Sequence, residues 1–546
     1  EYNKSIAEKH NFHIMGGFQC EQLRRTEFGL QRNGIIDPEK SEVDLTNGLS
    51  YQGVAITPNV NGARNQWQTA GFFGRINYNY AERYLAELNL RYDGTSKFRS
   101  DKMWKLFPSI SLGWRISEEN FMKNTKDWLS NLKLRLSYGS LGNQNIDNWY
   151  QTYQTIAYRA FTGYWLQNGQ KTNTTSAPGL VSSLLTWEKV ESYNVGLDFG
   201  FLNNRLTGSF DYFVRNTKNM VGKAPELPSI LGTGVPVTNN TDLRTNGWEL
   251  QLSWNDQLAN GLHYGVTFNL SDSRTKITRY PNNPTNSIDT YIKGRYINEI
   301  WGYTTKGIAK SNEEMNAHLS TTDQSTIGSN WAAGDIMYED TNNDKQINDG
   351  ARTITDHGDL KVIGNSTPRF LWGIDLNASW KGFDIRAFFQ GVMKRDAWLG
   401  GSWGSLEYYF GATNSGEWWA TGITAVKDYY RDANTWSVAN GYQKANQDAF
   451  LPRATFSNKN ERCQTRYLMN AAYMRLKNFQ AGYTIPRNIT TKWGISNMRV
   501  FVSIENLFTI TKMPKQFDPE MIGTDSRHSN GYPLSKTFSF GINVTF

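Results

Sequence analysis

Apolar and polar residues alternate strictly at the C-terminal end of the chain. The apolar positions there are Phe538, Phe540, Ile542, Val544 and Phe546. Successive side chains of a β-strand point to opposite faces, so this pattern predicts a strand over residues 537–546 with one apolar and one polar face. Half-buried sheets of soluble proteins also contain such strands. The meaning of the pattern therefore depends on how often it recurs.

The alternation recurs along most of the chain. Its apolar positions fall within 12–18, 76–80, 84–92, 110–116, 132–138, 193–199, 206–214, 248–254, 264–270, 370–380, 383–389, 500–504 and 538–546. Allowing for stretches that slip phase, we predict about 14 strands. One such slip lies in YMRLKNFQAGYT, where Met474 and Leu476 change register before Phe479. An inserted residue explains the change, so we predict a β-bulge there.

The residues on the two faces indicate the environment of these strands. Many polar positions are fully charged, such as Arg75, Glu87, Arg135 and Arg386, and the apolar faces often begin or end in Tyr or Trp. The inner faces of a soluble sandwich favour Val, Ile and Leu without aromatic ends. Lipid-facing strands with aromatic residues at both interfaces are typical of outer-membrane barrels. This pattern argues against a soluble lectin-like β-protein.

The connections alternate between short and long. Short turns are expected at 81–83, 201–205, 255–261 and 381–382, and long connections at 94–106, 142–187, 217–245, 272–367, 393–468 and 509–533. Outer-membrane barrels have short periplasmic turns and long extracellular loops, and only a closed barrel satisfies strand edges within a bilayer. The predicted fold class is therefore all-β, a transmembrane antiparallel β-barrel with long extracellular loops.

Composition narrows the possible partners. Aromatic residues make up 14% of the chain, yet the mean hydropathy is −0.60, and there is no run of about 18 apolar residues that would form a transmembrane helix. The net charge is +8, but Lys and Arg are scattered, which argues against nucleic acid. The charge fits contacts with lipid or lipopolysaccharide headgroups, or a polar lumen. The first residues, EYNKSIAEKH, contain no initiator Met or signal peptide, so we expect a mature or truncated chain.

Several long stretches resemble one family in collinear order. They are LRYDGTSKF, LFPSISLGWRISEENFM, LKLRLSYGSLGNQNI, TWEKVESYNVGLDFGFLNNRLTGSFDYFVRNTKNM, AGDIMYEDTNNDKQIND, YMRLKNFQAGYTIP and VSIENLFTITKMPKQFDPE. Together they span residues 70–546 and resemble SusC/RagA-like TonB-dependent outer-membrane transporters.

The resemblance implies a 22-stranded barrel plugged by an N-terminal domain. Residues 1–546 would then be its C-terminal part, without the plug, the TonB box and the first strands, which are cleaved, carried on another chain or not included here. It also implies the outer membrane of a Gram-negative bacterium of the Bacteroidetes type. The implied partners are a SusD-like surface lipoprotein as a lid, and the TonB–ExbB–ExbD complex acting through the missing N-terminal part. Pairs of transporter and lid would assemble as a dimer.

Transport rather than catalysis is expected, because no catalytic motif is present and the six His do not cluster like metal ligands. Oligosaccharide is the expected substrate, since most of the family is associated with glycan uptake. Oligopeptide import of the RagA type is the alternative. A passive outer-membrane porin is a further hypothesis.

One segment, DTNNDKQINDGA, is similar to a cation-binding loop. An EF-hand-type loop has oxygen ligands at positions 1, 3, 5, 7 and 9 and an acid at 12, with Gly at 6. The matching residues are Asp340, Asn342, Asp344, Gln346 (through its carbonyl) and Asn348. Lys345 replaces the Gly and Ala351 the final acid. Either the loop binds Ca²⁺ or it has lost that ability; no other cofactor is expected.

A second candidate site is the aromatic-rich segment WLGGSWGSLEYYFGATNSGEWWATGITAVKDYYRDANTW. Its candidate ligand-binding residues are Trp403, Tyr408, Tyr409, Trp418 and Trp419, followed by Tyr429, Tyr430 and Trp436. Aromatic faces stack on sugar faces, and the surrounding Asn and Asp residues could accept sugar hydroxyls. The alternative is that these rings pack the loop against its neighbours or a partner. The stretch KDYYRDANTW resembles one found across the family whatever the substrate.

Overall fold

The structure is a computed structural model. It describes residues 1–546 except 100, 145, 147, 157, 160–161, 176–177, 225–227, 229, 231–233, 399–426, 456, 516 and 523–532.

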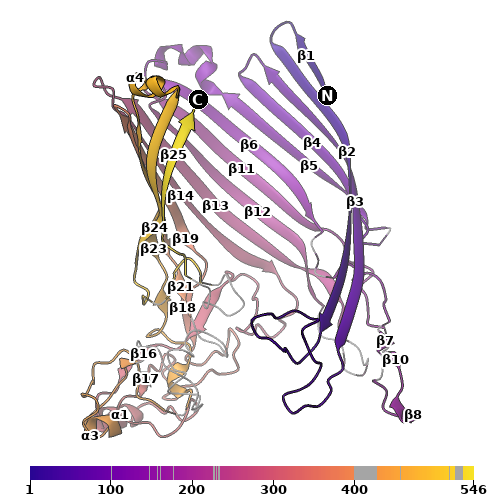
Figure 1. Cartoon of the computed structure of the whole chain (residues 1–546), viewed down its shortest axis with the longest axis vertical. Coiled ribbons are helices and arrows are strands. Elements are labelled where there is room, and N and C mark those ends of the chain that lie inside the picture. Colours follow the sequence, from indigo (N-terminus) through magenta and orange to yellow (C-terminus); the bar gives the residue numbers. More distant parts are fainter. Residues whose placement is uncertain are drawn as a thin grey trace. The chain divides into compact units, whose positions relative to one another are not determined.

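Fifteen strands form one sheet in which chain neighbours are also sheet neighbours (Figure 1). They are β1 (Tyr2–Ile6), β2 (His10–Gln31), β3 (Asn59–Tyr80), β4 (Tyr84–Thr95), β5 (Trp104–Arg115), β6 (Leu129–Asn143), β11 (Glu188–Phe201), β12 (Leu206–Lys223), β13 (Val237–Gln257), β14 (His263–Arg279), β19 (Arg369–Trp380), β20 (Phe383–Lys394), β23 (Tyr473–Thr484), β24 (Asn497–Thr511) and β25 (Thr537–Thr545). The sheet agrees with the expected count of about 14.

Shorter elements lie in the long connections. The strands are β7 (Tyr158–Arg159), β8 (Leu166–Gln167), β9 (Gln170–Lys171), β10 (Thr174–Thr175), β15 (Glu299–Gly302), β16 (Thr305–Ile308), β17 (Ile336–Tyr338), β18 (Lys361–Asn365), β21 (Asp396–Ala397) and β22 (Met469–Asn470). The described helices there are α1 (Asn312–Leu319) and α3 (Trp436–Ala439), whereas α4 (Arg487–Thr490) lies in the connection between β23 and β24. Within the described part of the chain, no helix is long and apolar enough to cross a membrane.

Short and long connections alternate as expected. Turns of a few residues join β3 to β4, β11 to β12 and β19 to β20 at the predicted places. The turn predicted at 255–261 lies instead at 258–262, because β13 continues to Gln257. Some long connections are shorter than expected because strands extend into them; β12 and β13, for example, leave only residues 224–236 between them.

The predicted bulge is present in β23. Phe388 of β20 pairs with Asn478 and Phe389 with Leu476, so Lys477 has no partner on β20. The pairing of β23 with β24 shifts at the same place, between Leu476 and Asn478. The extra residue keeps both Leu476 and Phe479 on the apolar face.

The chain divides into two compact units, of which the first comprises Glu1–Gly113, Leu136–Tyr193 and Arg215–Asp242. In this unit β2 and β3 pair antiparallel along all 22 residues of each strand. A small core forms beside the sheet from Phe98, Phe107, Ile146, Leu185 and Trp187. The Trp187 indole N–H donates to the Met103 carbonyl (2.9 Å).

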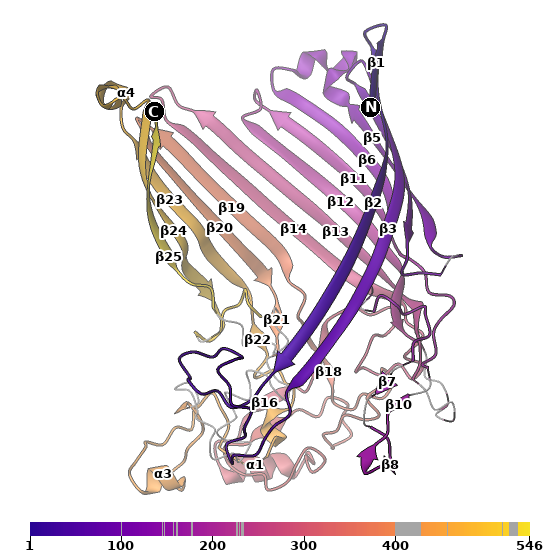
Figure 2. The same ribbon diagram turned by 45° about the vertical axis from the view of Figure 1, so that its right-hand side comes forward.

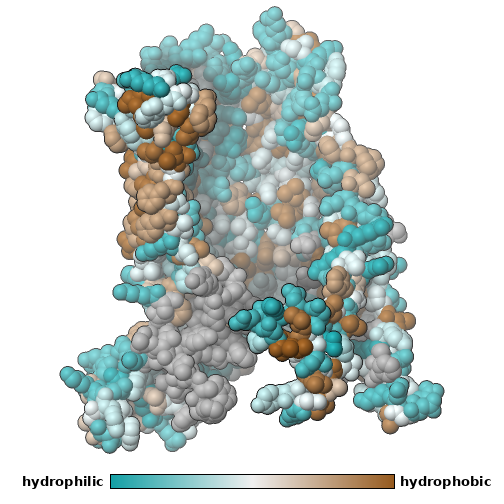
Figure 3. All heavy atoms as spheres, viewed as in Figure 1, coloured by the Kyte–Doolittle hydropathy of each residue, from teal (hydrophilic) through white to brown (hydrophobic). Residues whose placement is uncertain are grey.

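The second unit comprises Trp114–Arg135, Asn194–Val214 and Leu243–Phe546. Its strands β14, β19, β20, β23, β24 and β25 pair antiparallel in that order. One face of these strands is apolar and exposed, and apolar side chains gather over β23 to β25 (Figure 3). Exposed apolar residues on a sheet face are expected where lipid, and not water, is the solvent.

The connections of the second unit contain its buried core. This core includes Tyr303, Ile336, Tyr338, Ile347, Leu451 and Tyr467. The short strands β16 and β17 pair beside it, and α1 packs on them through Met315 and Met337 (Figure 2). The long connections are therefore folded structures and can position a binding site.

Candidate ligand-binding site

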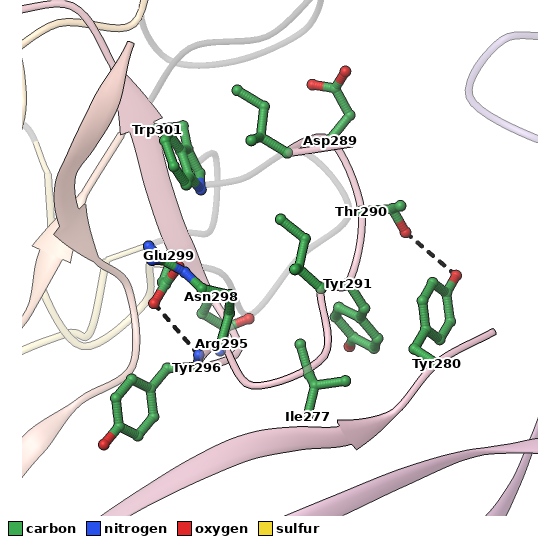
Figure 4. A pocket seen from close by; sticks show the side chains of 12 residues that line it. Ile277, Tyr280, Asp289, Thr290, Tyr291, Arg295, Tyr296, Asn298, Glu299 and Trp301 are labelled. Carbon is green, nitrogen blue, oxygen red and sulfur yellow. Dashed lines mark hydrogen bonds and ion pairs between the residues drawn. The ribbon is translucent and has the colours of Figure 1, made fainter. Parts of the chain in front are cut away.

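A pocket of about 390 Å³ lies where segment 280–301 follows β14 (Figure 4). Ile277 of β14 contributes a buried side chain, and Trp301 of β15 stands across from it. The other lining side chains come from Tyr280, Ile288, Asp289, Thr290, Tyr291, Ile292, Arg295, Tyr296, Asn298 and Glu299. All belong to the second unit.

Backbone pairing fixes the far end of this segment on β14. The Ile277 N–H donates to the Arg295 carbonyl (2.9 Å), and the Gly294 N–H donates to the Ile277 carbonyl (2.7 Å). Gly294 has φ +88°, a conformation that favours glycine, and the chain reverses there. The segment thus lies beside the end of β14, on the side where β19 pairs with the earlier part of the strand, up to Ser271 and Leu371.

A buried amide shapes the other end of the segment. Asn283 accepts from the Ser287 N–H (2.7 Å) and donates to the carbonyls of Ser287 (2.8 Å) and Tyr291 (3.0 Å). The Ile288 N–H also donates to the Arg352 carbonyl (2.9 Å). Because these bonds satisfy the buried backbone groups, the loop has a defined conformation without a regular helix or strand.

Aromatic side chains give the pocket its apolar surface together with three Ile. Tyr280 and Tyr291 meet edge to face with ring centroids 5.4 Å apart, a favoured geometry for aromatic pairs. The Thr290 hydroxyl donates to the Tyr280 hydroxyl (3.3 Å), as Figure 4 shows. Trp301 packs against the buried core of the connections. The rings are therefore held in place before any ligand arrives.

The charged lining residues Asp289, Arg295 and Glu299 each belong to an ion pair, and Arg352, the partner of Asp289, lies outside the lining. Arg352 donates to both carboxylate oxygens of Asp289 (2.5 and 3.0 Å), and these bonds hold the pKa of Asp289 below its ordinary value. The Arg295 Nε donates to Glu299 (2.8 Å), and its guanidinium lies 5.2 Å from the Trp301 ring centroid. Each charge has an opposite partner, so the pocket combines many donors and acceptors with little net charge.

This arrangement suits a neutral ligand with many hydroxyl or amide groups. Aromatic faces cover the apolar surface of a sugar or a side chain, and paired carboxylate and guanidinium groups bind neighbouring hydroxyls or a peptide backbone. The described lining contains no nucleophile placed beside a general base, so the geometry supports binding and not covalent chemistry.

The predicted cation loop folds on itself. Asp340 accepts from the N–H groups of Asn343 (2.6 Å) and Lys345 (2.8 Å), and Asp344 accepts from that of Gln346 (2.8 Å). Lys345 has φ +67°, the conformation that Gly has at this position of such a loop.

The remaining residues of the cation loop join the same network. Asn342 Oδ1 accepts from the Asp344 N–H (3.0 Å), and Asn348 Nδ2 donates to the Gln346 carbonyl (3.3 Å). The buried Asp359 accepts from the N–H groups of Thr341 and Asn348 across the loop. Among the described residues, no group of three or more His, Cys, Asp or Glu is placed to hold a metal ion. Calcium binding here stays a prediction, which titration with CaCl₂ would test.

The predicted aromatic site falls mainly outside the described residues. Trp403, Tyr408, Tyr409, Trp418 and Trp419 lie in 399–426, so their role stays a prediction.

The end of that aromatic segment is described. Tyr430 is buried and its hydroxyl donates to the Lys310 carbonyl (2.7 Å), so this ring packs the loop against its neighbours. The Tyr429 hydroxyl donates to Gln443 (2.8 Å). Trp436 is exposed and stacks on Tyr442 at 5.4 Å.

The sequence pattern does not predict the pocket. Its residues lie in the connection predicted over 272–367, where no periodic pattern marks them. The only local signal is the density of aromatic and charged residues in TYIKGRYINEIWGY.

Comparison with known proteins agrees with the fold. Residues 22–356 match the family described as TonB dependent receptor-like, beta-barrel. The chain is 28% identical to TonB-dependent receptor P3 of Formosa agariphila, over all of this chain and 51% of that protein. It is also 28% identical to TonB-dependent receptor SusC of Bacteroides thetaiotaomicron, over 87% of this chain and 43% of that protein. The RagAB peptide importer in its open-open state has the same fold, with a TM-score of 0.76 at 22% identity, covering all of this chain and 54% of that chain.

The chain therefore belongs to the TonB-dependent receptor-like β-barrel family. Members of this family are outer-membrane barrels that transport and do not catalyse, as expected from the alternation and the family resemblance. The expected all-β transmembrane barrel class is confirmed. The chain spans about half the length of the curated relatives it matches.

Proposed function

We propose that the chain is the barrel portion of a TonB-dependent importer that takes oligosaccharides across the outer membrane. The pocket carries this proposal. It presents the rings of Tyr280, Tyr291 and Trp301 together with Asp289, Arg295 and Glu299, each of which is held in an ion pair. A neutral polyhydroxyl ligand suits such a lining, because its hydroxyls can bond to the donors and acceptors of the pocket and it has no charge that would need a partner.

The mechanism we propose follows from the family. A SusD-like lipoprotein covers the long connections as a lid, and substrate is held between the lid and a plug that lies outside residues 1–546. The TonB–ExbB–ExbD complex pulls on the plug from the periplasm. Pairs of transporter and lid form a dimer. The folded connections, with their own buried core, support this proposal because a lid needs a defined surface to close against.

Oligopeptide is the second candidate. The Asp289 carboxylate and the Arg295 guanidinium, each in its own ion pair, would also suit the termini and backbone of a peptide. The protein with the same fold named above is a peptide importer.

Two measurements test these proposals. Mass spectrometry of the complex from native outer membranes should find a plug-bearing segment and a lid lipoprotein with this chain; recovery of this chain alone, at about its own 62.3 kDa, would favour a passive porin. Calorimetric titration of the same complex with neutral oligosaccharides and with oligopeptides should give saturable binding for the sugars. Saturation by peptides alone would reject the glycan proposal and leave the importer standing.

A further inference from the structure

A second concavity, of about 240 Å³, lies on the other face of the same strands. Along β14, Tyr264, Val266, Phe268 and Leu270 form one face, and the alternation continues on that face with Asp272, Arg274 and Lys276. Along β13, Trp254, Leu252, Leu250 and Trp248 are followed on their face by Asn246 and Arg244. Arg244, Arg274 and Lys276 thus lie where the apolar face ends.

The strand direction places these cations on the long-connection side. β14 begins after the short turn 258–262 and ends at the connection that contains the pocket. Short turns of outer-membrane barrels are periplasmic, and long connections are extracellular. Arg244, Arg274 and Lys276 therefore lie at the level of the outer leaflet headgroups, next to Tyr212 and Trp248, which also line the concavity. Tyr and Trp are enriched at this interface.

Carboxylates do not neutralise these cations. Asp272 also lines the concavity, but it is buried and its carboxylate accepts hydrogen bonds from Nε and Nη2 of Arg369. Within the described residues, Arg244, Arg274 and Lys276 take part in no ion pair. Arg244 has one weak contact, from its Nε to Asn246 (3.4 Å). Three positive charges that face one concavity repel one another, and an anion bound between them relieves that repulsion.

Tyr296 prepares the concavity for a phosphate. Its backbone pairs with Lys276, the Arg274 guanidinium lies 3.5 Å from its ring centroid, and the Lys276 ammonium lies 5.1 Å from it. Stacking on the ring fixes the plane of the guanidinium and leaves its N–H groups free at the edge. A fixed guanidinium binds two phosphate oxygens at once, with less entropy lost than for a free side chain.

We propose that Arg244, Arg274 and Lys276 bind a phosphate of the lipopolysaccharide headgroup in the outer leaflet. The proposal uses the family's membrane location and is independent of the substrate. The apolar face that continues from the concavity favours a lipid over a soluble anion, because only a lipid also places acyl chains along Trp248, Leu250 and Leu270.

The test uses the transporter complex in detergent, with native mass spectrometry and titration of lipid A with and without its phosphates. R274Q/K276Q should weaken binding of phosphorylated lipid A about fivefold per cation removed, or about 25-fold. K293Q, which removes a nearby cation outside the concavity, is the control. Inorganic phosphate should not displace lipid A from the complex at the concentration at which lipid A itself saturates the site.

Three results would overturn the proposal. They are unchanged lipid binding by the folded double variant, equal binding of dephosphorylated lipid A, and competition by inorganic phosphate as strong as that by lipid A. The last would identify a site for soluble anions. Should R274Q/K276Q fail to assemble, R244Q supplies the same comparison with an expected fivefold loss, because Arg244 is exposed and lies on a different strand.

Discussion

Arg453 donates two hydrogen bonds of 2.8 Å to Asp335 across 118 residues of sequence, and the carboxylate that it holds is completely buried. Lys459 and Asn460 contact the same carboxylate at 2.8 and 3.0 Å. This cluster joins the segment before β17 to the segment before β22. It is one of the polar anchors of the folded connections that contain the ligand pocket.

Removing the carboxylate should open these connections. We expect Asp335→Asn to cost about 3–5 kcal/mol of local stability, because it leaves the buried Lys459 ammonium uncompensated. Amide exchange at Ile336 and Arg453, whose N–H groups bond to Asn460 and to Gly334, should rise at least a hundredfold. Asp448→Asn breaks the exposed pair with Lys310 and should change nothing measurable. Equal exchange in the two variants would contradict this.

Acid should have the same effect as that substitution. Burial alone would raise the pKa of Asp335, but the hydrogen bonds from Arg453, Asn460 and Lys459 outweigh it and hold the pKa below its ordinary value of 3.8. A group with a lowered folded-state pKa stabilises the fold above its unfolded pKa, and this contribution disappears as the pH falls below that value. Pepsin cleavage within 429–470 should therefore increase steeply below about pH 4. Asp335→Asn should lack this step, and a step of the same size in the variant would assign it to another group.

The pocket aromatics should determine substrate affinity. Tyr291 contacts Tyr280 and is 41% exposed, so its ring is available to a ligand. We expect Tyr291→Ala to weaken oligosaccharide binding about tenfold, or about 1.4 kcal/mol. Trp436→Ala removes a ring from another exposed stacked pair, Trp436 and Tyr442, and is the control for calorimetry. Equal losses in both variants would place the binding site elsewhere.

Two adjacent positions of β24 should differ in their tolerance of charge. Val502 pairs with Ala481 and Phe540 on the apolar face, whereas Ser503 pairs with Gln480 and Ser539 on the polar face. We expect Val502→Asp to cost about 2 kcal/mol in lipid and to reduce the fraction of protein assembled in the outer membrane. Heat-modifiable migration on gels measures that fraction. Ser503→Asp should assemble normally, and failure of both variants alike would argue against the assignment of faces.

Much of the sheet follows from period-2 alternation, but its full length does not. The paired strands β2 and β3 run far beyond the apolar positions of Phe12 to Phe18, into the mostly polar stretch NVNGARNQWQTAG. The ladder between the two strands satisfies that backbone without an apolar face, and side-chain patterns carry no signal of it. The bulge at Lys477 was predictable because an inserted residue shifts the pattern itself.

The ligand pocket could not be predicted for a different reason. Its shape depends on Asn283, whose side chain replaces the hydrogen bonds of a regular element, and on pairing between Ile277 and Arg295. Neither contact has a periodic signature, and both require the fold to exist first. The predicted cation loop shows the converse, because the motif that begins at Asp340 has the left-handed backbone at Lys345 that such a loop requires. Its binding of any ion depends on ligands that a motif does not specify and stays a prediction.

In segment 295–297, the consecutive side chains of Arg295 and Tyr296 point to opposite sides. Arg295 points into the pocket with Glu299, whereas the Tyr296 ring is turned away from Tyr291 (Figure 4) and lies under Arg274 on the opposite face. Residues 295–297 thus lie between the pocket and the concavity that contains Arg274 and Lys276. If a ligand in one of them displaced this segment, the affinity of the other for its ligand would change, and thermodynamic reciprocity would make the two changes equal. A lipid bound in the concavity would then act as an effector of ligand binding in the pocket.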